Sequence, residues 1–170
     1  MLTPAARRSL RETLLKEINP VRVGVLSDTH NLLRPRVLEL LAGCDRILHA
    51  GDVRELEILR RLERIAPVSA VRGNTDAGRT ASELPEELTG DIDGLPFGMI
   101  HRREDVPRDW PSRLRLVVFG HSHRPEMEWH GQCLLLNPGA CGARRFHLPL
   151  TLAILTVADR RIVPEIRAVE

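Results

Sequence analysis

Short apolar runs alternate with amphipathic segments from residue 21 onward, and this alternation predicts strands joined by helices. The runs are VRVGVLS (21–27), RILHAG (46–51) and PVSAVRG (67–73), and they are separated by the helical patterns RPRVLELLAG (34–43) and VRELEILRRLERI (53–65). Continuous apolar runs of this length are typical of parallel strands that are covered on both faces. The sequence therefore predicts a parallel sheet built from βαβ units.

Beyond residue 76 the pattern changes to hairpins. TASELPEEL (80–88) is expected to form an irregular connection, and a short helix is expected near residues 107–113. Strands are predicted in LTGDIDGLPFGMIH (88–101, turning at Asp93-Gly94), RLRLVVFG (113–120), EMEWHGQCLLLN (126–137, turning at His130-Gly131) and TLAILTVADRRIVPEIRAV (151–169, turning at Ala158 to Arg160). The pattern indicates a mixed α/β domain with two sheets over residues 21–170.

Residues 1–20 are expected to form an N-terminal helical extension. Thr3 can cap a helix, Pro4 suits its first turn, and Leu10, Leu14 and Ile18 form an apolar stripe. We expect this helix to pack on the domain or on a neighbouring subunit, which leaves a homo-oligomer open.

Composition narrows the class of protein. The 170 residues suit one domain, and a net charge of +2 gives no argument for nucleic acid or an anionic membrane as partner. Cys44, Cys133 and Cys141 form no C-x-x-C pair, which favours a reducing compartment. No apolar stretch approaches the ~18 residues of a membrane span. A cytoplasmic location is expected.

Polar side chains with oxygen or nitrogen donors follow five successive predicted strands. They are Asp28 and His30, Asp52, Asn74 and Asp76, His101, and His121 with His123. Each motif alone is more often a helix cap, a turn or a solvated residue. In open α/β sheets, however, ligand-binding groups gather outside the carboxyl ends of the strands. Donors at every one of these ends therefore predict a shared metal site.

The charges of this donor set suit an anionic ligand. Two divalent ions would bring four positive charges, of which Asp28 and Asp52 neutralise two, so the remaining charge favours a phosphate. A bridging carboxylate could hold two ions ~3.5–4 Å apart, the spacing used for in-line displacement at phosphorus. A structural zinc site would instead be a closed set of four Cys or His ligands.

Taken in order, the motifs DTH (28–30), GD (51–52), GNTD (73–76), His101, GHSH (120–123) and NPG (137–139) resemble those of the calcineurin-like metallophosphoesterases. The compact length resembles the small bacterial and archaeal phosphodiesterase branch, and the similarity extends from residue 21 to about 158. The resemblance implies an α/β fold, a four-layer α-β-β-α sandwich with two mixed sheets flanked by helices.

The resemblance also implies a ligand set. One metal would take Asp28, His30 and His123, and the second would take Asn74, His101 and His121, with Asp52 bridging both. Mn²⁺ is the first expectation for this mixed ligation, and Fe, Zn²⁺ or Ni²⁺ are alternatives. The implied function is a dinuclear metal-dependent phosphoesterase, more specifically a phosphodiesterase, in which a metal-bridging hydroxide attacks a small phosphate ester. Asn74 would stabilise charge on the phosphoryl oxygens and so act in both catalysis and substrate binding.

Two positions depart from the family pattern. Thr75 stands where much of the superfamily has a His and the small branch often has a Cys, and a threonine cannot serve as a general acid near neutral pH. Asp76 is the nearest titratable candidate for that role, and the alternative is that it orients the Asn74 loop by hydrogen bonds. Arg102 and Arg103 follow His101, where the family usually shows a glycine and often a second His beyond it. We expect Arg102 to bind a substrate phosphate, with a solvated loop as the alternative.

Two other functions remain open from sequence. A non-catalytic metallophosphoesterase-like scaffold that binds proteins, as in the retromer subunit that this fold resembles, is favoured slightly by Thr75 and the Arg102-Arg103 pair. A dinuclear hydrolase of non-phosphate esters or amides has no specific support. Because the chain has no tyrosine and only Trp110 and Trp129 as large indoles, an extended nucleic-acid channel is disfavoured.

Overall fold

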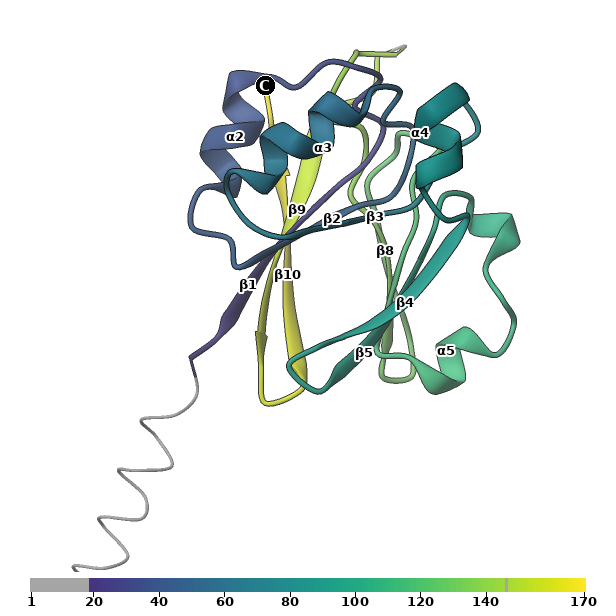
Figure 1. Cartoon of the computed structure of the whole chain (residues 1–170). Coiled ribbons are helices and arrows are strands. Elements are labelled where there is room, and N and C mark those ends of the chain that lie inside the picture. The colour runs from purple at the N-terminus through teal and green to yellow at the C-terminus, as the bar shows by residue number, and fades with distance from the viewer. Residues whose placement is uncertain (1–18, 146) are drawn as a thin grey trace, which may run out of the picture.

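Two five-stranded sheets face each other in the computed structural model, which describes residues 19–145 and 147–170 (Figure 1). The helix expected over residues 3–18 lies outside the described residues. The first sheet has the order β10-β9-β1-β2-β3. Its strands are β1 (Val21–Leu26), β2 (Arg46–His49), β3 (Val68–Ala70), β9 (Thr151–Ala158) and β10 (Arg161–Ala168). β1, β2 and β3 are parallel, as predicted, and β9 pairs with β1 in the antiparallel direction.

The second sheet is mixed as well, with the order β4-β5-β6-β8-β7. Its strands are β4 (Glu87–Ile92), β5 (Leu95–Ile100), β6 (Leu116–Val118), β7 (Glu126–His130) and β8 (Cys133–Asn137). β5, β6 and β8 run parallel, while β4 and β7 form the antiparallel edges. The helical elements of the domain are α2 (Pro35–Leu41), α3 (Leu56–Glu63), α4 (Gly78–Glu83), the 3₁₀ turn η1 (Arg103–Asp105) and α5 (Trp110–Arg113).

Three apolar clusters hold the layers together. Side chains such as Val23, Val25 and Leu48 point between the sheets, whereas Leu26 and Ile47 of the same strands pack against α2 and α3. A third cluster joins α5 to the outer face of the second sheet. Since the inner strands are covered on both faces, their sequences are continuously apolar. The expected four-layer α-β-β-α sandwich is confirmed.

Two local predictions were wrong. Residues 78–83 form α4 rather than an irregular connection, because Thr80 is buried and its hydroxyl bonds the carbonyl of Arg54. The β7–β8 hairpin turns at residues 131–132, one residue later than expected, because His130 pairs with Cys133. The Asp93-Gly94 turn is confirmed, with φ values of 51° and 78° that suit a two-residue hairpin. No helix of the described residues is long and apolar enough to cross a membrane.

Candidate metal centre

The loops that carry the predicted ligands meet at one end of the sandwich. Asp28 follows β1 and its amide donates to the carbonyl of Gly51 after β2, at 3.0 Å. Gly120, which follows β6, donates to the carbonyl of His101 after β5, at 2.9 Å. The amide of His121 then donates to Asp28 Oδ2 at 3.1 Å, which ties the second sheet to the first. The loops that follow the parallel strands of both sheets therefore meet at one place, as the sequence predicted.

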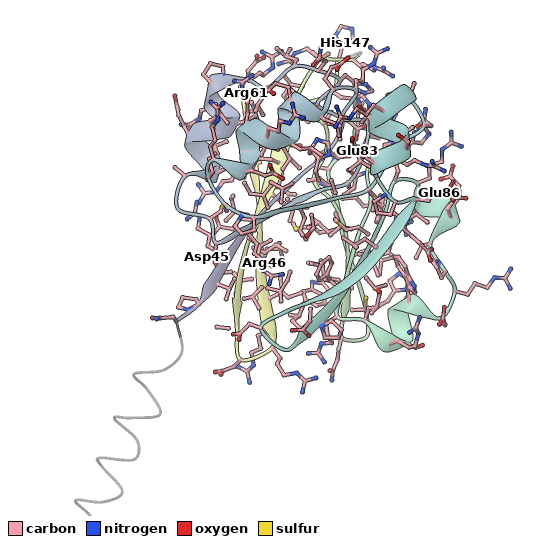
Figure 2. All side chains as sticks on the ribbon, in the orientation of Figure 1. Asp45, Arg46, Arg61, Glu83, Glu86 and His147 are labelled. Atoms are coloured by element: carbon pink, nitrogen blue, oxygen red, sulfur yellow. The ribbon has the colours of Figure 1, made fainter. Side chains whose placement is uncertain are left out.

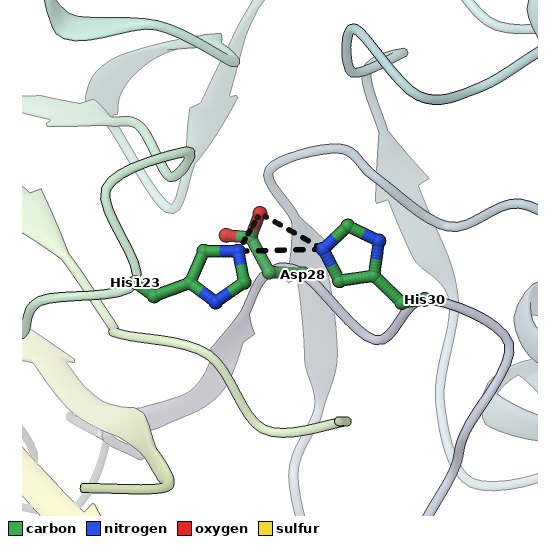
Figure 3. A group of neighbouring side chains, drawn as sticks. All are labelled: Asp28, His30 and His123. Carbon is green, nitrogen blue, oxygen red and sulfur yellow. Dashed lines mark hydrogen bonds and ion pairs between the residues drawn. The ribbon is translucent and has the colours of Figure 1, made fainter. Parts of the chain in front are cut away.

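Asp28, His30 and His123 form the first donor group (Figure 3). His123 Nε2 lies 3.2 Å from Asp28 Oδ1, and His30 Nε2 lies 3.8 Å from the same oxygen. The two imidazole nitrogens are 3.3 Å apart. The side chains come from positions up to 95 residues apart in the sequence (28 to 123), and all three are buried. One cation among these atoms would satisfy three acceptors at once.

His101 is the centre of the second donor group. Its Nδ1–H donates to the carbonyl of Ala50 at 2.7 Å, so in the neutral form of the ring the lone pair is on Nε2. That nitrogen lies 3.0 Å from Asn74 Oδ1 and 3.5 Å from Asp52 Oδ2. Three acceptor atoms thus face one another. Either a proton or a metal ion has to be shared among them, and a carbonyl partner that fixes the tautomer is the arrangement expected of a metal-binding histidine.

Asp52 lies between the two groups. Its Oδ2 is 3.7 Å from His30 Nε2 on one side and 3.5 Å from His101 Nε2 on the other. Its Oδ1 accepts the amide of Thr75 at 2.8 Å, which fixes the rotation of the carboxylate. Asp28 and Asp52 also stand together with His101 in one compact group of potential ligand atoms. The position suits a carboxylate shared by two ions.

His121 lies beside His101 but outside the two compact groups of potential ligand atoms. Its ring packs edge-on against the ring of His101, with 5.3 Å between the centroids and 74° between the planes. His30 and His123 form the other imidazole pair, also at 5.3 Å. The two histidines that flank Ser122 therefore accompany different donor groups.

The backbone is strained where the ligands stand. Ten described residues other than glycine have positive φ, and five of them are predicted ligands: Asp28 (55°), His30 (46°), Asp52 (57°), His121 (68°) and His123 (59°). A residue with a β-carbon loses about 1–2 kcal/mol in this left-handed conformation. Such strain persists where the surrounding structure imposes a particular side-chain direction. Four of these five side chains are buried, and His121 is partly exposed.

A buried atom without a partner tests whether a cation fits here. Asp28 Oδ1 is fully buried, and no hydrogen-bond donor among the described residues serves it. Burial alone would raise the pKa of Asp28, but its contact with His123 and the nearby His101 lower that pKa below the ordinary value. Burial opposes ionisation of Asp52 too, yet His101 and Thr75 lower its pKa. Two ionised carboxylates facing imidazole lone pairs match the charge and ligand type of a divalent metal site.

The histidine pKa values follow from the same contacts. Burial lowers the pKa of His30 and outweighs the opposing effect of Asp52 and Asp28, so the ring is neutral at neutral pH. Burial also acts to lower the pKa of His101, but Asp52 and Asp28 raise it above the ordinary value. The same two carboxylates that draw a proton to His101 would draw a cation in its place.

Several neighbours position the ligands without being ligands themselves. His49 is buried, its pKa is lowered to about 4 by desolvation, and both ring nitrogens are used: Nδ1 accepts from Gly51 and Nε2 contacts the hydroxyl of Thr29. Asn137 donates to the carbonyl of Gly120 and to Ser122 Oγ, which fixes the GHSH turn. The hydroxyl of Thr75 lies 3.5 Å from His30 Nδ1. Thr75 thus contacts the back of a ligand ring.

Asp76 joins two loops. Its Oδ1 accepts the amide of Arg54 at 2.6 Å and its Oδ2 accepts the amide of Gly73 at 2.7 Å. These are the loop-orienting bonds that the sequence offered as the alternative to acid catalysis. These bonds account for Asp76 without a role in catalysis, and its catalytic role stays a prediction.

An Asp76→Asn variant is expected to lose stability, because the amide NH₂ would face a backbone N–H where the carboxylate accepts. The expected loss in the free energy of unfolding is about 1–3 kcal/mol, measured by urea denaturation. The pH dependence of any hydrolysis should keep its shape. Loss of one limb of the pH profile with unchanged stability would instead identify Asp76 as a proton donor.

A pocket of about 380 Å³ opens beside the second donor group. It is lined by Arg72, Gly73, Asn74, Glu86, Ile100, His101, Arg102 and Asp105. Asn74, which is exposed, and His101 connect the pocket to the donors. Glu86 lies at the edge of the molecule beside the start of β4 (Figure 2). Arg102 lines this pocket, and its binding to a substrate phosphate stays a prediction.

Arg72 was missed by the sequence analysis. Its guanidinium donates to the carbonyl of Ala81 and pairs with Glu86 at the pocket wall. Arg72 directly precedes the GNTD motif, so the strand-end argument could have found it. Arg102 lies 4.0 Å from Glu104, whereas Arg103 pairs with Glu126 and Glu128 and lies over the ring of Phe119.

A four-layer sandwich with aspartate, histidine and asparagine donors at its strand ends defines the metal-dependent phosphoesterase class of α/β proteins. The chain belongs to the calcineurin-like phosphoesterase superfamily, whose domain model matches residues 21–160.

Known proteins resemble the chain in sequence or in fold. A probable metallophosphoesterase of Methanothermobacter thermautotrophicus is 31% identical over 158 residues, which cover 85% of this chain and 90% of the relative. Among solved structures, an archaeal phosphodiesterase shares the fold with a TM-score of 0.73 at 23% identity, covering 86% of this chain and all of its own. Vacuolar protein sorting 29 of Cryptosporidium parvum has a TM-score of 0.71 at 20% identity, covering 87% and 97% of the two chains.

Proposed function

We propose that the chain is a dinuclear metal-dependent phosphodiesterase that acts on a small phosphate ester, with Mn²⁺ as its first-choice ion. The observation that carries the proposal is the position of Asp52 between two donor groups, beside a pocket lined by Arg72 and Arg102. Asp28, His30 and His123 would hold one ion, and Asn74, His101 and His121 the other. The three free cysteines are all buried, which accords with a reducing compartment, and we infer a cytoplasmic location.

Each side chain near the metal centre would have a separate role in such a reaction. Two divalent ions supply Lewis acidity and lower the pKa of water when they are bound. Asn74, exposed at the pocket, can donate its amide to a phosphoryl oxygen and stabilise developing charge. Arg102 can fork onto the remaining phosphate oxygens. Thr75 offers no acid for the leaving group, so the proposal favours substrates whose leaving group departs readily or takes its proton from water.

Replacing Arg102 with alanine is expected to raise KM about tenfold while kcat changes little, because the guanidinium binds the phosphate in both ground state and transition state. Arg103→Ala is the matched control. This variant loses the pairs with Glu126 and Glu128, so its free energy of unfolding should fall while KM stays unchanged. Equal KM values for the Arg102 variant and the unaltered protein would remove Arg102 from the substrate site.

Hydrolysis of bis-p-nitrophenyl phosphate with added Mn²⁺ tests the proposed activity. The expected result is Mn²⁺-dependent release of nitrophenol that EDTA abolishes, faster than release from the monoester p-nitrophenyl phosphate. A carboxylate ester with the same leaving group, p-nitrophenyl acetate, separates phosphoesterase activity from that of a general dinuclear hydrolase. Preference for the acetate would refute the phosphate proposal.

A non-catalytic scaffold is the second candidate, supported by the fold shared with vacuolar protein sorting 29. Thr75 at the usual acid position accords with it. A scaffold, however, has no requirement for a strained backbone at five predicted ligand positions. Purified protein that binds metal and yet hydrolyses none of the phosphate esters would favour the scaffold.

A further inference from the structure

A second hollow lies at the end of the sandwich opposite the donor groups. β9 runs antiparallel to β1, so the β9–β10 turn at residues 159–160 stands at the amino end of β1. Arg115 stands at the amino end of β6, whereas His121 follows its carboxyl end. A six-residue strand such as β1 is about 20 Å long, which separates this hollow from the metal centre.

This hollow, which we call the distal pocket, has a volume of about 350 Å³. Its lining residues are Arg115, Trp129, Gly131, Gln132, Arg160, Arg161 and Ile162. A neighbouring hollow of about 460 Å³ shares Arg115, Gly131, Gln132 and Arg160 with it. Volumes from about 300 Å³ upward hold small-molecule ligands.

The apolar wall of the distal pocket is formed by side chains next to the apolar cluster between the two sheets. Trp129 pairs across β7–β8 with Leu134, and Ile162 pairs across β9–β10 with Val157. Both partners belong to the cluster between the sheets, so Trp129 and Ile162 face the gap between the two edge strands. Trp129 is 51% exposed there. An indole held at a rim in this way offers a flat surface for stacking.

The other wall is positively charged. Arg115 is half-buried, and its guanidinium bonds only neutral oxygens, the side-chain carbonyl of Gln132 and the backbone carbonyl of Arg160. Within residues 19–145 and 147–170, none of Arg115, Arg160 and Arg161 forms an ion pair with a carboxylate. Three arginines around one hollow, none of them in an ion pair among the described residues, favour an anion with several oxygens.

We propose that the distal pocket binds a free nucleotide, with its phosphates on Arg115, Arg160 and Arg161 and its base stacked on Trp129. A flat ring beside a multiply charged anion is the ligand chemistry that both walls share, since arginine forks match phosphate and indoles stack on bases. A volume of about 350 Å³ has room for one such molecule. The proposal is independent of hydrolysis, because it needs none of the metal ligands.

ADP titrated into the EDTA-treated protein tests the proposal by calorimetry and by intrinsic fluorescence. Trp110 is only 3% exposed, so a fluorescence change on binding reports on Trp129. The test variant is Arg160→Asn with Arg161→Gln; asparagine tolerates the φ of 58° at position 160. We expect saturable binding of ADP that this variant weakens at least tenfold.

The matched control is Arg61→Gln with Arg64→Gln on and after α3, which removes the same charge elsewhere (Figure 2 labels Arg61). It should bind ADP as the unaltered protein does, and circular dichroism should show both variants folded. Pyrophosphate, which lacks a ring, should compete at least tenfold more weakly than ADP. Absence of saturable binding, equal binding by the Arg160/Arg161 variant, or pyrophosphate binding as tight as ADP would overturn the proposal.

Discussion

An Asp52→Ala variant is expected to lose nearly all hydrolysis of bis-p-nitrophenyl phosphate and to bind less than half of the metal. Asp52 Oδ2 lies 3.7 Å from His30 Nε2 and 3.5 Å from His101 Nε2, so removing it uncouples the two donor groups. Metal ions contribute several kcal/mol to such reactions, which corresponds to roughly a thousandfold or more in rate. Initial rates with Mn²⁺ and elemental analysis of the dialysed protein measure both effects.

Asp109→Ala is the control for this substitution. Asp109 is an exposed carboxylate that pairs with Arg113 on the surface, and its removal should leave rate and metal content unchanged. An Asp52 variant that retained full Mn²⁺-dependent turnover would contradict the proposed site.

Gly73→Ala is expected to disable the centre through steric contact alone. A β-carbon at residue 73 would lie 2.1 Å from Asp52 Oδ1 and 2.3 Å from the Asp52 amide nitrogen, so the carboxylate would have to move. Overpacking of this kind costs about 1–3 kcal/mol in the free energy of unfolding. We expect a rate at least a hundredfold lower, because displacement by about 1 Å costs that much at a reacting centre. Rates and urea denaturation of the same preparation measure the two effects.

Gly43→Ala separates loss of stability from loss of the site. Gly43 has φ of 77° and no heavy atom within 4 Å of an added β-carbon, so alanine there strains the backbone and touches no ligand. Its free energy of unfolding should fall by about 1 kcal/mol with the rate retained. If Gly73→Ala behaved in the same way, the close approach of residue 73 to Asp52 would be irrelevant to function.

The fold could be predicted from the sequence because its inner strands are covered on both faces. Runs such as VRVGVLS and RILHAG have to be apolar on both sides, and turn signals such as Asp93-Gly94 stand where the backbone needs positive φ. Helix α4 was missed because its six residues carry little apolar periodicity and its order depends on contacts such as the Thr80 hydroxyl with Arg54. Tertiary contacts, and not the local sequence pattern, make this segment helical.

The sequence predicted the donor residues but not the contacts that hold them in position. Asp28, His30 and His123 were found because each follows a strand, and the topology of parallel sheets brings such positions together. The two bonds of Asp76 to Arg54 and Gly73 depend on where separate loops meet, which no local pattern records. The clash that makes Gly73 necessary is likewise visible only in three dimensions.

Anomalous diffraction from crystals grown with Mn²⁺ tests the shared site most directly. The account predicts two peaks a few ångströms apart, one among Asp28, His30 and His123 and the other beside His101 and Asn74, with Asp52 touching both. Crystals that took up no manganese at this end of the sandwich, or that held it away from these side chains, would contradict it.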